Sequence, residues 1–113
     1  MRAGDVVLVR FPFTSLDSTK KRPALLLRAT VLTPKIQLLT VAMITSQIDK
    51  LKIEGDCLLD AWEAAKLLHP SLVRLAKVAT LDLELIDKRL GRLSPSDLNV
   101  IRSRFCSLYK FWL

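Results

Sequence analysis

The sequence has 113 residues and a formal net charge of +7, and half of its residues are hydrophobic. This length allows one domain with a real core, and the hydrophobic content argues against a disordered chain. No apolar stretch approaches the roughly 20 residues that span a bilayer, and Arg2 and Asp5 interrupt the N-terminus before the core of a signal peptide can form. We therefore expect one cytoplasmic domain, residues 1–113, without a membrane partner.

The excess of basic residues bears on the kind of partner. In so small a domain it favours a polyanion, such as nucleic acid or an acidic protein segment. Solubility alone would also account for the charge. Composition therefore leaves both explanations open.

The two cysteines, Cys57 and Cys106, lie far apart in the sequence. Disulfides are uncommon in cytosolic proteins, and the lone His69 leaves too few partners for a zinc cluster. We expect both cysteines to be small buried hydrophobic residues. No metal and no cofactor are expected.

The N-terminal quarter predicts two strands that flank a basic loop. Val6–Phe11 alternates between two faces as a strand does, and Pro12, which has no backbone donor, should end its pairing. Thr14–Lys21 is polar and basic and should be a solvated loop. Arg22 precedes a proline, which favours extended backbone, and Pro23–Thr30 is the second predicted strand. Arg22 therefore lies at a fixed strand entrance beside an adaptable cationic loop.

The next strand is predicted to be buried on both faces. A turn at Thr33–Lys35 leads into Ile36–Thr45, which is apolar at almost every position. Such a strand suits the centre of a sheet or a closed sheet. It ends in Thr45, Ser46 and Gln47, whose side chains can all form hydrogen bonds. From spacing alone, an ordinary polar exit into a loop is the better explanation of these three residues.

The middle of the chain predicts short elements. Leu51–Ile53 and Cys57–Leu59 are strand candidates around a turn at residues 54–56. Asp60–Leu68 is predicted to be a short helix, because its first residue can cap it and Glu63 is spaced as in a capping box.

The segment that follows holds the only histidine. We interpret Trp62 as a core or interface residue and His69 as a surface turn residue, since no catalytic partner for it is evident in the sequence. Leu72–Leu81 then predicts a strand, Asp82–Asp87 a helical turn, and Arg89–Leu93 a short basic strand.

The last element is the clearest helix. Ser94 is a good N-cap, Pro95 suits the first helical position, and Asp97 lies in the first turn. Apolar residues recur every three or four positions: Leu98, Ile101, Phe105, Leu108 and Trp112. Further apolar residues widen this surface: Val100, Tyr109 and Phe111. The surplus predicts a partner in addition to a core.

Taken in order, these motifs resemble the PemK/MazF-type growth inhibitors, the toxins of type II toxin–antitoxin modules. The matching segments are Gly4–Val9, Phe11–Phe13, Arg22–Leu27, Ile44–Gln47, Trp62–Ala64, Pro70–Arg74, Ala79–Asp82 and Leu90–Ser94. No single segment is decisive, but together they cover nearly the whole chain.

The resemblance implies a mainly β fold, an SH3-like barrel with short helices and a C-terminal α-helix. It implies a homodimer that binds single-stranded RNA in a surface groove and cleaves it without a metal, as a sequence-selective endoribonuclease. The expected products carry a 2′,3′-cyclic phosphate and a 5′-hydroxyl. A cognate antitoxin would block the groove with an acidic tail and would bind DNA together with the toxin.

By position, the family's catalytic arginine corresponds to Arg22 and its catalytic hydroxyl to Thr45. Both residue types suit attack by a 2′-hydroxyl on phosphorus. A guanidinium offers paired donors to the charge that builds on the phosphoryl oxygens. A hydroxyl can orient the phosphate or take part in a proton relay. Because free arginine has a pKa above about 12, we expect Arg22 to act mainly as a transition-state stabiliser.

The residues next to these two are expected to bind RNA. Lys20 and Lys21 would hold the backbone without reading sequence, although a solvated charge run is the alternative. Ser46 and Gln47 would read bases of an unstacked strand by hydrogen bonding.

Two other functions are compatible with the same residues. The barrel is shared with toxins that poison DNA gyrase by protein contact, and the aromatic C-terminus would suit that use. A degenerate toxin that only binds RNA or antitoxin is the other, because activity depends on the geometry of the site to within about half an ångström.

Overall fold

The computed structural model describes residues 1–10, 20–50 and 52–112. Six strands form one antiparallel sheet in the order β4-β5-β3-β2-β1-β6. The strands are β1 (Asp5–Arg10), β2 (Lys21–Thr33), β3 (Ile36–Thr45), β4 (Asp56–Leu58), β5 (Leu72–Asp82) and β6 (Ile86–Arg92). The helices are α1 (Pro95–Leu108) and three single 3₁₀ turns, η1 (Trp62–Ala65), η2 (Leu83–Leu85) and η3 (Lys110–Trp112).

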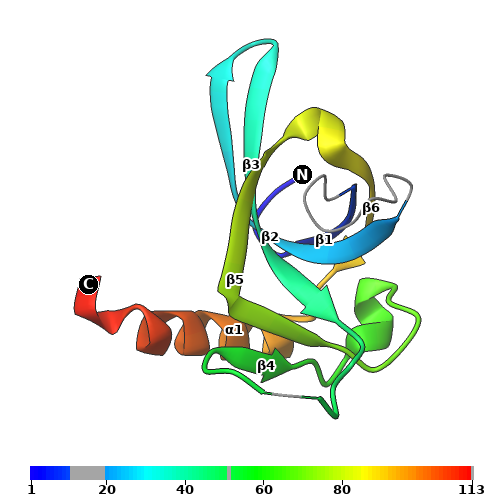
Figure 1. The fold of residues 1–113 in the computed structure, drawn as a ribbon, viewed down its shortest axis with the longest axis vertical. Coiled ribbons are helices and arrows are strands. Elements are labelled where there is room, and N and C mark those ends of the chain that lie inside the picture. Colours follow the sequence, from blue (N-terminus) through cyan, green and yellow to red (C-terminus); the bar gives the residue numbers. More distant parts are fainter. Residues whose placement is uncertain (11–19, 51, 113) are drawn as a thin grey trace.

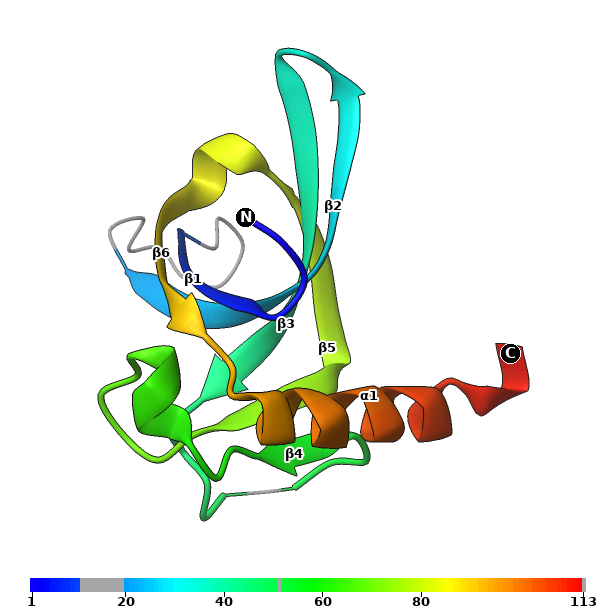
Figure 2. The ribbon, with the colours of Figure 1, turned by 180° about the vertical axis from the view of Figure 1, so that it is seen from behind.

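The sheet curls into a barrel that stays open along one seam. Figures 1 and 2 show β1, β2, β5 and β6 surrounding a common centre, with the β2–β3 hairpin standing out beyond it and α1 lying across the opposite end beside β4. The edge strands β4 and β6 do not pair with each other among the described residues. The expected fold class, a mainly β barrel with short helices and a C-terminal helix, is confirmed. No helix in the described part of the chain is long and apolar enough to cross a membrane.

The sheet has a hydrophobic cluster on each face. One cluster fills the barrel with side chains from β1, β2, β3 and β5, including Val7, Leu26 and Val41. The other lies between the opposite face of the sheet, η1 and α1, and includes Leu25 and Ile44. Because consecutive residues of a strand point to opposite faces, β2 and β3 supply both clusters. The predicted strand at Ile36–Thr45 is confirmed, and it is buried on both faces from Leu39 to Ile44, whereas Ile36 is exposed.

Most predicted strands form, with small shifts at their ends. The second strand begins at Lys21, earlier than predicted, because Lys21 and Arg22 still pair with β1. The prediction of a strand at Leu51–Ile53 was wrong for its described residues, Lys52 and Ile53, because neither belongs to a strand. Phe11, Pro12 and residues 14–19 of the predicted loop lie outside the described residues, as does Leu51.

The predicted helix at Asp60–Leu68 is mostly wrong. Only η1 forms there, and no side chain caps it. The carboxylate of Asp97 in α1 accepts hydrogen bonds from the backbone N–H groups of Asp60 (3.1 Å) and Ala61 (3.0 Å). Lys66 then ends the turn with a left-handed backbone, at φ 63°. The Asp60 N–H, to which Glu63 would bond in a capping box, is bonded to Asp97 instead.

The C-terminal helix is capped as predicted but ends earlier than its apolar pattern. The Ser94 hydroxyl accepts a hydrogen bond from the Asp97 N–H at 3.2 Å. Ile101 is buried and Leu108 packs against the core beneath α1. Trp112, beyond the end of α1, is 90% exposed, so the apolar spacing predicted core contact for a residue that has none in this chain.

The two cysteines have different surroundings. Cys57 in β4 is buried, as predicted, whereas Cys106 on α1 is exposed and the prediction for it was wrong. Both are free. Cys57 belongs to the hydrophobic cluster between the sheet and α1, whereas Cys106 lines an open pocket between α1 and β2.

We expect one thiol to react with a disulfide reagent in the native protein. Cys106 is accessible, while burial raises the pKa of the Cys57 thiol, so that little nucleophilic thiolate forms there. Titration of the thiolate that the reagent releases should give one equivalent per protein chain in buffer and two in urea. Cys106→Ser should abolish the native equivalent; a remaining equivalent would contradict the burial of Cys57.

A buried carboxylate ties the start of β1 to β6. Asp5 is 3% exposed, and its oxygens accept from the backbone N–H of Arg2 at 2.9 Å and from Arg92 Nη1 at 3.2 Å. Arg89 Nε lies 3.3 Å from Asp5 Oδ1. Burial by itself raises the pKa of Asp5, but the hydrogen bonds from Arg2, Arg92 and Arg89 outweigh it and hold this pKa below its ordinary value.

Asp5 should therefore stabilise the protein in a pH-dependent way. A carboxyl whose pKa is lower in the folded state stabilises the fold above its unfolded pKa of about 4, and this is lost as pH falls through the folded value. Asp5→Asn should lower the free energy of unfolding at pH 7 by about 2 kcal/mol and by much less at pH 3, in urea titrations. Glu63→Gln, at an exposed carboxylate, is the control. An equal loss at both pH values would contradict the linkage.

Candidate nucleic-acid interface

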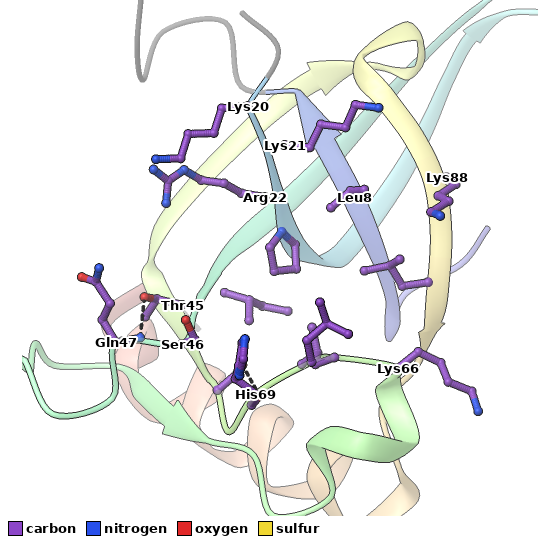
Figure 3. Close-up of a pocket in the computed structure, with 16 residues that line it drawn as sticks. Leu8, Lys20, Lys21, Arg22, Thr45, Ser46, Gln47, Lys66, His69 and Lys88 are labelled. Atoms are coloured by element: carbon purple, nitrogen blue, oxygen red, sulfur yellow. Dashed lines mark hydrogen bonds between the residues drawn. The ribbon is translucent and has the colours of Figure 1, made fainter. Parts of the chain in front are cut away.

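A cavity of about 520 Å³ opens between the ends of β2 and β3 and the segment that links η1 to β5. Its floor is apolar and its rim is basic and polar (Figure 3). The apolar lining residues are Leu8, Pro23, Ile44, Leu67, Leu68 and Leu90. The basic ones are Lys20, Lys21, Arg22, Lys66 and Lys88, and the remaining ones are Thr45, Ser46, Gln47, His69 and Ser71. A volume of this size is typical of small-ligand sites.

All six residues predicted from the sequence line this one cavity: Lys20, Lys21, Arg22, Thr45, Ser46 and Gln47. They come from segments more than twenty positions apart. Their roles stay predictions, but the expectation that the two segments converge agrees with the structure.

The register of β2 and β3 explains why Arg22 and Thr45 converge. The antiparallel ladder pairs Ala24 with Met43, and continuing this register by two residues sets Arg22 opposite Thr45. Residues opposite each other in an antiparallel pair point to the same face. Pro23 has no N–H to donate, so the ladder ends there and the two side chains meet the cavity at a strand end.

The cavity is strongly positive. Among the described residues, its lining holds five basic side chains and no carboxylate. Figure 3 shows Lys20 and Arg22 extending toward the side where Thr45 and Gln47 lie, and Lys88 on the opposite side. Lys21 is partly neutralised, because its Nζ lies 3.1 Å from Asp87 Oδ1. Lys20 is therefore better placed than Lys21 to hold an anion.

The exit of β3 is shaped by its own side chain. Thr45 Oγ1 accepts a hydrogen bond from the Gln47 N–H at 3.1 Å, which fixes the turn. The hydroxyl keeps its own proton to donate. Ser46 and Gln47 are exposed at the rim, where both can meet a ligand.

Sequence reasoning missed His69, which was interpreted as a surface turn residue. His69 is exposed, yet it lines the cavity, and Figure 3 shows its side chain among the other lining residues. Its backbone carbonyl accepts from Ser71 Oγ at 2.8 Å, and Ser71 is 3% exposed. No spacing in the sequence indicated this position, because the cavity forms only when β5 pairs with β3.

Tight packing positions the segment that carries Lys66 and His69. The preceding turn, η1, lies against Gly91 of β6, where a Cβ atom would come within 2.7 Å of the Ala65 carbonyl oxygen. Only glycine permits this approach. The carboxylate of Asp97 holds the entrance to the same turn. Two distant elements therefore determine where this wall of the cavity stands.

Within the described part of the chain, no group of three or more histidine, cysteine or acidic side chains is arranged to hold a metal ion. The polar groups of the cavity are donors and cations, which suit an anion.

Residues 2–109 match the family described as PemK-like, MazF-like toxin of type II toxin–antitoxin system, and the chain belongs to this family. The resemblance seen in the sequence is thereby confirmed. It extends from Arg2, three residues before β1, to Tyr109, the residue after α1. No significant match to a curated protein sequence was found.

Solved structures with the same fold support this assignment. The Mycobacterium tuberculosis toxin MazF-mt6 is 21% identical, with a TM-score of 0.69, over 94% of this chain and 96% of that one. MazF from Deinococcus radiodurans is 21% identical, with a TM-score of 0.68, over 97% and 96%. An endoribonuclease in complex with its cognate antitoxin, from a mycobacterial species, is 14% identical, with a TM-score of 0.69, over 95% and 92%.

Proposed function

We propose that this single-domain protein is a toxin that acts as a metal-independent, sequence-selective endoribonuclease on single-stranded RNA in the cytoplasm. The observation that carries the proposal is the cavity that Arg22 and Thr45 both line, with five basic side chains and no described carboxylate in its lining. Such a site attracts a polyanion. Its apolar floor can receive a base that has left the stack.

The chemistry we propose is attack by the 2′-hydroxyl on the adjacent phosphorus. The 2′-oxygen forms a bond to phosphorus as the bond to the 5′-oxygen breaks, which leaves a 2′,3′-cyclic phosphate and a 5′-hydroxyl. Arg22 would donate to the phosphoryl oxygens as they gain charge. Thr45 would orient the phosphate, Lys20 and Lys21 would hold the flanking backbone, and Ser46 and Gln47 would contact bases.

The same cavity suits inhibition by a cognate antitoxin. An acidic segment would compete with RNA for the basic rim, because both present negative charge to it. We also propose that the toxin works as a homodimer, as its family membership suggests. The mycobacterial endoribonuclease, solved with its cognate antitoxin, is similar in fold.

The test is to incubate the protein with a mixed RNA pool in excess EDTA and to sequence the new 5′ ends. We expect cuts at a short recurring sequence, with 5′-hydroxyl ends that polynucleotide kinase can label. A 2′-deoxy substitution at the cut site should abolish cleavage there. RNA that stays intact across pH and salt would overturn the proposal.

A second candidate is action by protein contact, without catalysis. It is favoured by the aromatic end of the chain, where Phe111 is 88% exposed and Trp112 is 90% exposed. Capture of gyrase by the protein, together with no RNA cleavage under any condition, would support it over the ribonuclease.

A further inference from the structure

Among the described residues that line the cavity, one side chain can take up a proton near neutral pH. Attack by a 2′-hydroxyl requires a group that takes its proton. Lysine and arginine are protonated at neutral pH, and threonine and serine hydroxyls are very weak bases. Among the described lining residues there is no carboxylate. The exception is His69, since imidazole is the side chain that changes charge between about pH 5 and 8.

The position of His69 suits this task. It stands in the cavity from the segment before β5, whereas Arg22 and Thr45 reach it from β2 and β3 (Figure 3). A phosphate held by Arg22 would thus have the imidazole on a different side from the guanidinium. The hydrogen bond from Ser71 Oγ to the His69 carbonyl, at 2.8 Å, and the proline that follows hold the backbone in place.

The charged side chains that line the cavity around His69 are all basic. Lys20, Lys21 and Arg22 face the cavity from β2 and the residue before it, Lys66 from the end of η1, and Lys88 from β6. Asp87 lies behind this rim and pairs with Lys21. The lysine ammonium groups among them can donate a proton, so proton donors are abundant and a proton acceptor is the scarce group.

We infer that His69 is a catalytic residue of the RNA cleavage reaction, the general base that takes the proton from the attacking 2′-hydroxyl. This rests on the proposed ribonuclease function. The O–H bond of the 2′-hydroxyl breaks as its oxygen bonds to phosphorus, and the proton moves to the free ring nitrogen of His69. The departing 5′-oxygen takes a proton from solvent. His69 later returns its proton to solvent, so no proton is consumed overall.

The test compares single-turnover cleavage by the parent, His69→Asn and Lys66→Gln on one RNA that the parent cuts. We expect His69→Asn to slow cleavage by about 10²- to 10⁴-fold without weakening RNA binding, measured by anisotropy in an oligonucleotide with a 2′-deoxy cut site. The cleavage rate of the parent should fall as the pH is lowered, and this fall should be absent in His69→Asn. Free imidazole should restore part of the rate to His69→Ala. Lys66→Gln should weaken binding but keep the pH profile.

A substrate with sulfur in place of the bridging 5′-oxygen separates a base from an acid. Thiolate leaves without a proton, so the defect of His69→Asn should persist on this substrate if His69 is the base. A defect that disappears there would place His69 on the leaving group and overturn the inference. Cleavage by His69→Asn at the parent's rate and pH profile would also overturn it, with the ribonuclease function intact. If the parent protein cuts no RNA, both the proposed ribonuclease function and the inferred role of His69 are overturned.

Discussion

Replacing Arg22 with alanine is expected to lower the rate of RNA cleavage by about 10²- to 10³-fold without unfolding the protein, the loss typical of removing one donor to a charged transition state. Arg22 is the second residue of β2, and its backbone pairs with Val9 of β1. Its backbone contacts do not need the guanidinium. Single-turnover rates and urea midpoints, measured on the same preparation, separate the two effects.

Two further variants make the role of Arg22 specific. Arg22→Lys keeps the charge but loses the planar pair of donors. Compared with Arg22→Ala, we expect it to recover RNA binding but little of the cleavage rate. Arg28→Ala removes the same charge from an exposed position of β2 that does not line the cavity, and it should cut at nearly the parent's rate. Full activity in Arg22→Ala would show that Arg22 is not the catalytic arginine.

The strand framework and its convergent pair could be predicted from the sequence because they depend on short-range patterns. Alternation along β1, a proline after Arg22 and an apolar β3 indicate two antiparallel strands with polar ends. Two register shifts in the β2–β3 hairpin, between Leu26 and Arg28 and between Val31 and Thr33, set Arg22 opposite Thr45. The sequence predicts only that the two strand ends lie close together, which follows from hairpin pairing. No distant contact is needed for that prediction.

The remaining wall of the cavity depends on contacts that local patterns do not carry. Asp60 and Glu63 have the spacing of a capping box, but Asp97, 37 positions after Asp60, takes the backbone donors instead. His69 reaches the cavity because η1 packs on Gly91 of β6. A histidine before a proline has the local appearance of a turn residue wherever it stands, so its place in the cavity was hidden until the tertiary contacts were known.

Asp97→Ala is expected to be among the most destabilising single changes in the chain. The carboxylate is 3% exposed and holds two backbone donors of the segment before η1, at 3.1 and 3.0 Å. Removing it leaves both N–H groups without their protein partner in a part-buried site, at about 1–2 kcal/mol each. We expect a loss of about 2–4 kcal/mol in the free energy of unfolding, measured by urea titration at constant slope.

The same substitution tests how the cavity is built. Asp97→Asn keeps one acceptor oxygen and should lose about half as much stability, while Asn99→Ala, at an exposed position of α1, should lose less than about 0.5 kcal/mol. If Asp97 sets the wall that carries Lys66 and His69, folded Asp97→Asn should bind RNA more weakly than the parent, although Asp97 itself does not line the cavity. Unchanged RNA affinity in that variant would mean that Ser71 and Gly91 suffice to hold the wall.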